Sequence, residues 1–395
     1  MASLTALDSA LEGALAAGRI VGAVVLVSRA GQPVYARAAG FADREARIPM
    51  RDDAVFRLAS VSKSIVTAAA LRLVEKGALG LHDAVSRWLP EFRPPCPDGS
   101  RPDISIHQLL THTSGLSHSY LEPTGSPWHT AGVSDGLDGL ELTLAENVDR
   151  LAQLPLAFKP GTSWRYSLGI DVLGAVLCRV TGDSLPDIVA ELVTQPLGML
   201  QTRFTAAAGQ RLVTPYAGGP AGPVRMHDGI ALALTQEQIA VLGGPAIRAT
   251  GHPGKIDGVV RFSPSRAFSA KAFPSGGAGM IGTAHDILRF MEAIRTGGKP
   301  ILRDETIRMM MRDHVGPGVG TQGPGWGFGY GWAVLSDPLA DTPQRPGTVQ
   351  WGGAYGHSFF LDPTERLTVV ALTNTAFEGT SGRFPGAIRD AAYRG

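Results

Sequence analysis

Short apolar runs bounded by turn residues lie at both ends of the chain and predict β-strands. Near the start, the run at 21–28 is followed by a turn at 30–33 and a second run at 34–36, which is typical of a hairpin. Past Ser275 similar runs return at 330–335, 349–351, 357–361 and 367–373. These positions predict one sheet built from both ends of the chain.

Apolar residues at helical spacing predict helices in the rest of the chain. Leu4, Leu7, Leu11 and Leu15 predict an amphipathic first helix, and residues 387–393 a last one. Residues 60–76 are apolar on nearly every face, which predicts a buried helix. Between 83 and 270 the chain alternates helical stretches (104–111, 142–151, 171–181) with Pro- and Gly-rich loops (117–139, 206–223). We therefore expect an α+β protein with an inserted, largely helical region.

Composition narrows the class of protein. The 395 residues are 44% hydrophobic and 18% charged, which is typical of a globular protein with a sizeable core. A net charge of +1 gives no reason to expect nucleic acid or an anionic membrane as partner. The first residues fit neither a signal peptide nor a membrane span, and the two cysteines are too few for a disulfide framework. We expect a cytoplasmic protein, and its oligomeric state stays open.

Two serine motifs point to a serine hydrolase, but they belong to different folds. Gly132-Val133-Ser134-Asp135-Gly136 matches G-x-S-x-G, the nucleophile elbow of many ester hydrolases. An elbow needs a buried strand, a sharp turn and a helix, whereas Ser134 has Gly-rich loop on both sides. A chance match is the favoured interpretation, and His357, on a predicted strand, is then no triad histidine.

The second motif, Ser60-Val61-Ser62-Lys63, matches S-x-x-K at the start of the buried helix. Helix N-termini stabilise negative charge, and Lys63 lies one turn on, on the same face as Ser60. Burial favours the neutral amine, which can accept the serine proton, whereas an arginine would stay charged. The chain has only six lysines, and none of the other five has a serine three residues before it. The alternative is a capping serine with an incidental lysine.

Tyr166 is a candidate third member of the site. It lies in the stretch PGTSWRYSLGIDVLGAVL, in a turn just before an apolar helix. A phenol held beside an ammonium group is favoured as phenolate and can then act as a base. Alone, such a tyrosine would more often be a packing residue.

Five sequence blocks together resemble a known family. FRLASVSK, LLTHTSGL, PGTSWRYS, SGGAGMIGTA and QWGGAYGHS occur in the order seen in class C β-lactamases and related penicillin-recognising proteins, and are most similar to family VIII carboxylesterases. The resemblance covers nearly the whole chain. It implies a β-lactamase-like fold with an antiparallel sheet flanked by helices and an all-helical region beside it. We expect one domain from residues 1–60 and 270–395, and a largely helical one from 61–269.

The resemblance also implies roles for individual residues. Ser60 would be the nucleophile, with Lys63 and Tyr166 as the general-base pair. The backbone N–H groups of Ser60 and Ala354 would form the oxyanion hole. Trp351, Gly352 and Gly353 would replace the K-T-G block, with glycines that let substrate lie close to the strand backbone.

Two departures from the penicillin-recognising pattern indicate the substrate. Trp351 and Gly352 stand where a cation and a hydroxyl would bind a carboxylate, and Leu168 stands where an asparagine would bind an acylamido group. We therefore expect a serine carboxylesterase of neutral, short-acyl esters. A β-lactamase or D-Ala-D-Ala peptidase is the alternative among enzymes, and a catalytically silent acyl-binding protein is the alternative outside them.

Other motifs do not change this picture. His112 and His118 lie six residues apart around a turn without an H-E-x-x-H pattern, so we expect no metal, and His112 is expected to support its loop. Residues 318–323 match G-x-G-x-x-G but precede no helix, which indicates a loop and not a dinucleotide site. We expect no cofactor.

Overall fold

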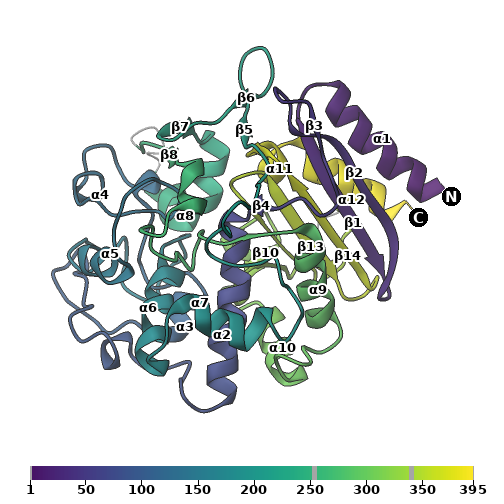
Figure 1. Cartoon of the computed structure of the whole chain (residues 1–395). Helices are drawn as coiled ribbons and strands as arrows, with labels where there is room; N and C mark the ends of the chain where they lie inside the picture. Colours follow the sequence, from purple (N-terminus) through teal and green to yellow (C-terminus); the bar gives the residue numbers. More distant parts are fainter. Residues whose placement is uncertain (1, 251–255, 338–341, 395) are drawn as a thin grey trace.

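An antiparallel sheet of eight strands organises the protein, in a computed structural model that describes residues 2–250, 256–337 and 342–394 (Figure 1). The strand order is β10-β11-β12-β13-β14-β1-β2-β3. Its strands are β1 (Gly22–Arg29), β2 (Gln32–Asp43), β3 (Ile48–Pro49), β10 (Trp326–Phe328), β11 (Ala333–Leu335), β12 (Val349–Gly353), β13 (His357–Asp362) and β14 (Leu367–Thr373).

The two ends of the chain meet in the middle of this sheet. β1 pairs with β14 in a register that runs from Ala23 opposite Thr373 to Arg29 opposite Leu367. The predicted sheet from both ends is therefore confirmed. The division into domains at residues 60 and 270 stays a prediction.

Alternate residues of β1 face two different cores, as the strand period of two requires. Val25 and Val27 pack with α1 (Ala2–Ala16) and α12 (Arg383–Tyr393), which lie together on one face of the sheet (Figure 1). Val24 and Leu26 belong to the larger core, which includes residues of α2 (Ser62–Glu75) and α9 (Ala284–Arg295) on the other face.

The larger core extends into the helical region around α2, which is buried over most of its length. Capping boxes begin two of its helices: Ser105 with Gln108 at α3 and Thr143 with Glu146 at α5. The remaining helices are α2 (Ser62–Glu75), α3 (Ile106–Leu110), α4 (Pro127–Thr130), α5 (Leu144–Leu151), α6 (Gly169–Thr181), α7 (Leu185–Val189), α8 (Gln236–Thr250), α9 (Ala284–Arg295), α10 (Asp304–Met311) and α11 (Glu378–Ser381).

Short strands and turns connect these layers. The strands form three small sheets: β15-β5-β6 (Thr375–Ala376, Tyr216–Ala217, Val224–Arg225), β4-β9 (Phe56–Arg57, Ile281–Gly282) and β7-β8 (Ile230–Ala233, Val259–Phe262). Helical turns of 3₁₀ type lie at Ala59–Val61, Val85–Arg87, Ser119–Leu121, Pro264–Phe268 and Pro317–Val319, and a π-helical turn at Ala190–Thr194. Within the described residues, no helix combines the length and apolar character that crossing a membrane requires.

Several predicted elements differ in their bounds from the observed ones, and the structure gives a reason for three of them. The predicted strand 34–36 is only part of the 12-residue β2, whose Ala- and Gly-rich remainder has no clear alternation. The predicted strand 330–335 begins only at Ala333, because Gly331 has a φ of +90° and ends the preceding turn. The predicted helix 60–76 begins as a 3₁₀ turn and becomes α-helical at Ser62.

Candidate active site

Ser60 lies in the 3₁₀ turn Ala59–Val61 that leads directly into α2. The residue before it, Ala59, is buried and has a φ of +46°, a left-handed conformation that costs an L-residue about 1–2 kcal/mol. The turn is held from both sides: Leu58 N–H donates to Met280 O at 2.8 Å, and β12 packs against it. Such strain persists only where the surroundings impose it, and here it fixes the backbone that presents Ser60.

Lys63 meets Ser60 one helical turn later. Its Nζ lies 3.4 Å from Ser60 Oγ and donates to the carbonyl oxygen of Gly277 at 2.8 Å. The lysine side chain is 2% exposed, so this amine is withdrawn from water. The S-x-x-K spacing therefore brings the hydroxyl and the amine together, as the sequence predicts.

Tyr166 joins the pair from the loop before α6. Its N–H donates to Leu242 O of α8 at 2.9 Å, and its ring centre lies 4.5 Å from Lys63 Nζ. The ring also contacts Trp351 at 5.3 Å between centres. Its Oη is buried and has no hydrogen-bond partner among the described residues. The structure thus brings together three groups from two separate parts of the chain.

A cavity of about 460 Å³ opens onto these groups. Its lining includes Ser60, Lys63 and Tyr166, together with Trp351, Gly352 and Ala354. This volume lies within the range typical of small-molecule sites. Two predicted substrate contacts, Leu168 and Gly353, do not line it: Leu168 is buried at the start of α6, where its N–H donates to Ser117 O.

Close packing of the protein backbone explains the two glycines of β12. A Cβ on Gly353 would lie 2.2 Å from Leu58 O, in the turn that presents Ser60. A Cβ on Gly352 would lie 2.3 Å from His357 O on the neighbouring strand. These positions need glycine because protein backbone approaches there. The predicted role of these glycines, to let substrate lie close to the strand backbone, does not explain these backbone contacts.

Asp171 is a further charged group near Lys63, and the sequence did not predict it. Its carboxylate accepts from Gly277 N–H at 3.4 Å, while Gly277 O accepts from Lys63. Complete burial raises the pKa of Asp171, and the nearby Ser275 and Lys63 oppose that rise. The signal that could have indicated it is a lone carboxylate in the largely apolar helix α6.

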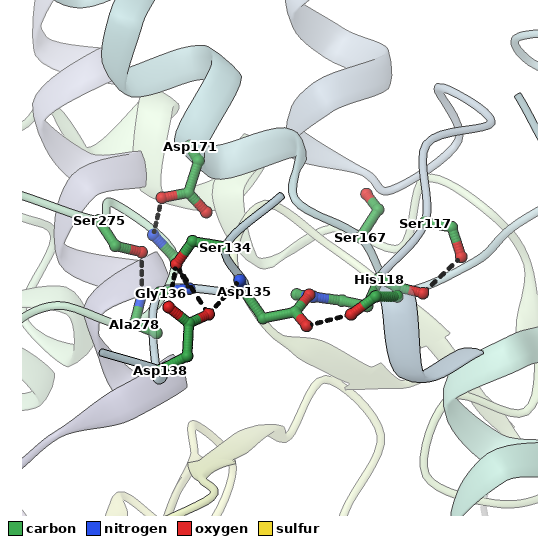
Figure 2. Close-up of polar contacts among 12 residues, drawn as sticks. Ser117, His118, Ser134, Asp135, Gly136, Asp138, Ser167, Asp171, Ser275 and Ala278 are labelled. Atoms are coloured by element: carbon green, nitrogen blue, oxygen red, sulfur yellow. Dashed lines mark hydrogen bonds and ion pairs between the residues drawn. The ribbon is translucent and has the colours of Figure 1, made fainter. Parts of the chain in front are cut away.

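A histidine–carboxylate pair, also unpredicted, lies on another side of Tyr166. His118 Nδ1 lies 2.7 Å from Asp135 Oδ1, and both residues line the cavity (Figure 2). The His118 ring stacks on Tyr120 at 4.7 Å and lies 5.2 Å from the Tyr166 ring. Burial lowers the pKa of His118, and the bond to Asp135 opposes this effect. The net direction favours the neutral imidazole.

His112 supports its loop, in agreement with expectation. It has a φ of +56°, its carbonyl accepts from Arg165 N–H, and its Nδ1 lies 3.0 Å from Ser167 Oγ. Burial holds the pKa of His112 well below its ordinary value. Its ring packs on Tyr166 at 4.8 Å between centres, but it does not line the cavity.

Ser134 has the loop context that the sequence indicates. It is fully buried, does not line the cavity, and its Oγ lies 2.9 Å from both carboxylate oxygens of Asp138, to which it donates (Figure 2). His357 lies elsewhere, on β13, with Nε2 2.7 Å from Arg57 O. The described residues therefore contain no nucleophile elbow around Ser134 and no triad with His357. Residues 318–323 begin in the 3₁₀ turn Pro317–Val319 and continue as a loop before β10.

Comparisons with known proteins agree with this geometry. The Beta-lactamase family model matches residues 7–393. The chain belongs to the beta-lactamase family. It is 52% identical to Esterase EstB of Burkholderia gladioli over 99% of this chain and 96% of that protein. The predicted fold and the predicted resemblance to the esterase branch are confirmed.

Two solved structures extend the comparison. EstCE1, described as a hydrolase with promiscuous acyltransferase activity, has a TM-score of 0.92 and 47% identity, and the match covers 98% of each chain. Unliganded simvastatin synthase LovD from Aspergillus terreus has a TM-score of 0.74 at 20% identity, over 100% of this chain and 98% of that chain. The second likeness concerns the fold alone.

Proposed function

We propose that this protein is a serine carboxylesterase that hydrolyses neutral, short-acyl esters through an acyl-enzyme on Ser60. The observation that supports this most directly is the contact between Lys63 Nζ and Ser60 Oγ beside the Tyr166 ring, at the edge of a cavity. The similarity to Esterase EstB and to the hydrolase EstCE1 supports the same activity.

In the proposed reaction, Ser60 Oγ attacks the ester carbonyl carbon while the Tyr166–Lys63 pair takes its proton. The pair returns that proton to the alkoxide oxygen as the bond to the alcohol breaks. A water molecule then gives a proton to the pair and attacks the acyl carbonyl, and Ser60 recovers its proton when the acid leaves. Burial of Lys63 and its bond to Gly277 O support this role, because they hold the amine against Ser60.

The negative charge that develops on the carbonyl oxygen needs donors at fixed positions. We assign these to the backbone N–H groups of Ser60 and Ala354, which both line the cavity. Close packing of Gly353 against Leu58 O supports this assignment, because it holds the end of β12 beside the Ser60 turn.

The lining of the cavity supports a neutral substrate. Apolar side chains on it include Trp351, Leu234, Val260 and Phe377. Its basic side chains in the described part of the chain are Lys63 and Arg389, and Arg389 is paired with Asp390 at 2.7 Å. A buried carboxylate without a fixed cation is costly, which disfavours the β-lactamase alternative.

We also propose that the protein acts in the cytoplasm on a small-molecule ester and has no nucleic-acid partner. Its net charge of +1 supports the second point. Both cysteines, Cys96 and Cys178, are free, which supports a reducing compartment.

A fluorophosphonate probe tests the central proposal. Intact-mass analysis should give one adduct, and peptide mapping should place it on Ser60. Reaction with p-nitrophenyl butyrate on the same preparation should be lost in proportion to labelling. Labelling at Ser134, or activity that survives complete labelling of Ser60, would contradict the assignment.

A further inference from the structure

His118 is fixed more firmly than a packing residue beside a cavity requires. Asp135 holds its Nδ1 at 2.7 Å, and Tyr120 stacks on its ring with an angle of 16° between the planes. Asp135 is itself anchored, because its second oxygen accepts from Ser119 Oγ at 2.5 Å. The chain therefore fixes both the position and the rotation of the imidazole.

This arrangement also fixes where the imidazole proton lies. A carboxylate only accepts hydrogen bonds, so the proton of neutral His118 is on Nδ1 and faces Asp135. Nε2 then carries a lone pair and can only accept. Among the described residues Nε2 has no partner, although it is buried and its side chain belongs to the cavity lining.

Tyr166 presents a second unpaired atom beside it. Its Oη is buried and also has no partner among the described residues, and the two ring centres are 5.2 Å apart. Buried polar atoms in folded proteins are nearly always hydrogen-bonded, so such a pair indicates a bound polar group. The acceptor atom Nε2 of His118, beside the phenol of Tyr166, suits a small molecule whose single oxygen carries two hydrogens.

We propose that His118, oriented by Asp135, binds the hydrolytic water together with Tyr166 and directs it at the acyl-enzyme. This inference rests on the proposed function. One O–H of the water faces Tyr166 and gives its proton to the Tyr166–Lys63 pair as the oxygen attacks the acyl carbon. The other O–H donates to His118 Nε2 and stays on the oxygen, which becomes the hydroxyl of the released acid. The bond from carbon to Ser60 Oγ breaks, and Ser60 takes the proton from the pair.

An alcohol differs from water at this position because it has only one O–H. Once that O–H faces Tyr166, the alcohol has no second O–H to donate to His118 Nε2. Attack by an alcohol uses Tyr166 in the same way but does not need His118 Nε2. The site therefore favours hydrolysis over transfer of the acyl group to an alcohol. Loss of the acceptor on His118 should impair attack by water more than attack by an alcohol.

The test compares the two reactions on one acyl-enzyme. Butyryl transfer from p-nitrophenyl butyrate is followed at fixed methanol, and the ratio of methyl butyrate to butyric acid is measured. We expect His118→Phe to raise this ratio about tenfold and to lower kcat for hydrolysis by about ten- to a hundredfold, since misplaced reactants typically cost about 10². The acylation burst of p-nitrophenol should change far less.

Further variants separate this role from general damage to the site. Asp135→Asn should raise the ratio as well, because an amide can donate to Nδ1 and move the imidazole proton to Nε2. His118→Gln keeps an acceptor oxygen and should recover part of the hydrolysis. His112→Asn is the matched control, since His112 also packs on Tyr166 but lies off the cavity.

Two results would overturn the inference. One is an unchanged ratio in both His118→Phe and Asp135→Asn while the acyl-enzyme still forms on Ser60. The other is an equal rise in His112→Asn. If mass spectrometry finds no acyl group on Ser60 in the unaltered protein, the proposed function itself fails, and the inference fails with it.

Discussion

The two serine motifs occupy regions that differ in almost every respect except their sequence pattern. Ser60 is partly exposed at a cavity, follows a strained residue and lies 3.4 Å from an amine. Ser134 is fully buried in a loop, and Asp138 accepts a hydrogen bond from its hydroxyl. One environment leaves the hydroxyl available beside a base, and the other commits it to holding a loop together. The proposed difference in reactivity therefore rests on what surrounds each serine and not on the glycines on either side of Ser134.

Replacing each serine by alanine should produce the largest difference between the two regions. We expect Ser60→Ala to lower kcat for p-nitrophenyl butyrate by at least about 10⁴-fold, as loss of a nucleophile does in other serine hydrolases. Ser134→Ala should keep most of the activity, provided that circular dichroism shows it to be folded. Loss of turnover in folded Ser134→Ala would reverse the assignment.

The groups beside Ser60 should come next in size. Tyr166→Phe should lower kcat by about 10²–10⁴, the usual contribution of a general base. Lys63→Arg should be nearly as damaging as Lys63→Ala, since a guanidinium cannot share its proton. Steady-state kinetics at one pH measures all three. A mild effect of Tyr166→Phe would leave Lys63 as the base alone, and an active Lys63→Arg would show that positive charge suffices.

The choice of substrate sharpens the comparison at the cavity itself. A chromogenic cephalosporin would bring a carboxylate beside Trp351 and Gly352, whose side chains offer it neither a cation nor a hydroxyl. We expect kcat/KM for p-nitrophenyl butyrate to exceed that for the cephalosporin by more than about a hundredfold, the equivalent of one missing charge-assisted contact. Similar values on one preparation at one pH would favour the β-lactamase alternative.

Stability should report on the role of Ser134, with the smallest effect. Ser134→Ala removes a donor from buried Asp138, whose pKa is already raised by burial, and leaves Gly136 N–H without its 3.1 Å acceptor. We expect a loss of about 1–3 kcal/mol in the free energy of unfolding. Urea unfolding measures the free energy of unfolding of this variant and of Ser60→Ala. Ser60→Ala is the control, because within the described residues the Ser60 hydroxyl makes no bond to a carboxylate. Equal stabilities would show that the Asp138 contact contributes little.

Local sequence was sufficient for the parts of the site that depend on short-range spacing. One helical turn places Lys63 on Ser60, and the order of the five blocks indicates the fold. It was insufficient where segments far apart along the chain meet. Hydrogen bonds link Asp171 to Lys63 through Gly277, which is 106 residues from Asp171, and nothing near either residue in the sequence specifies that contact. The glycines of β12 were predicted as part of the site, but their reason is backbone packing that only the fold displays.

The pairing of β1 with β14 has a consequence for how the protein is made. β1 leaves the ribosome early, but its partner at residues 367–373 comes at the end of synthesis. At roughly 5–20 residues per second, one edge of the first hairpin stays open for on the order of tens of seconds. β12, which supports the turn around Ser60, also emerges late. A nascent chain therefore carries Ser60 for most of its synthesis without the strand that packs against its turn, and it exposes an aggregation-prone edge throughout that time.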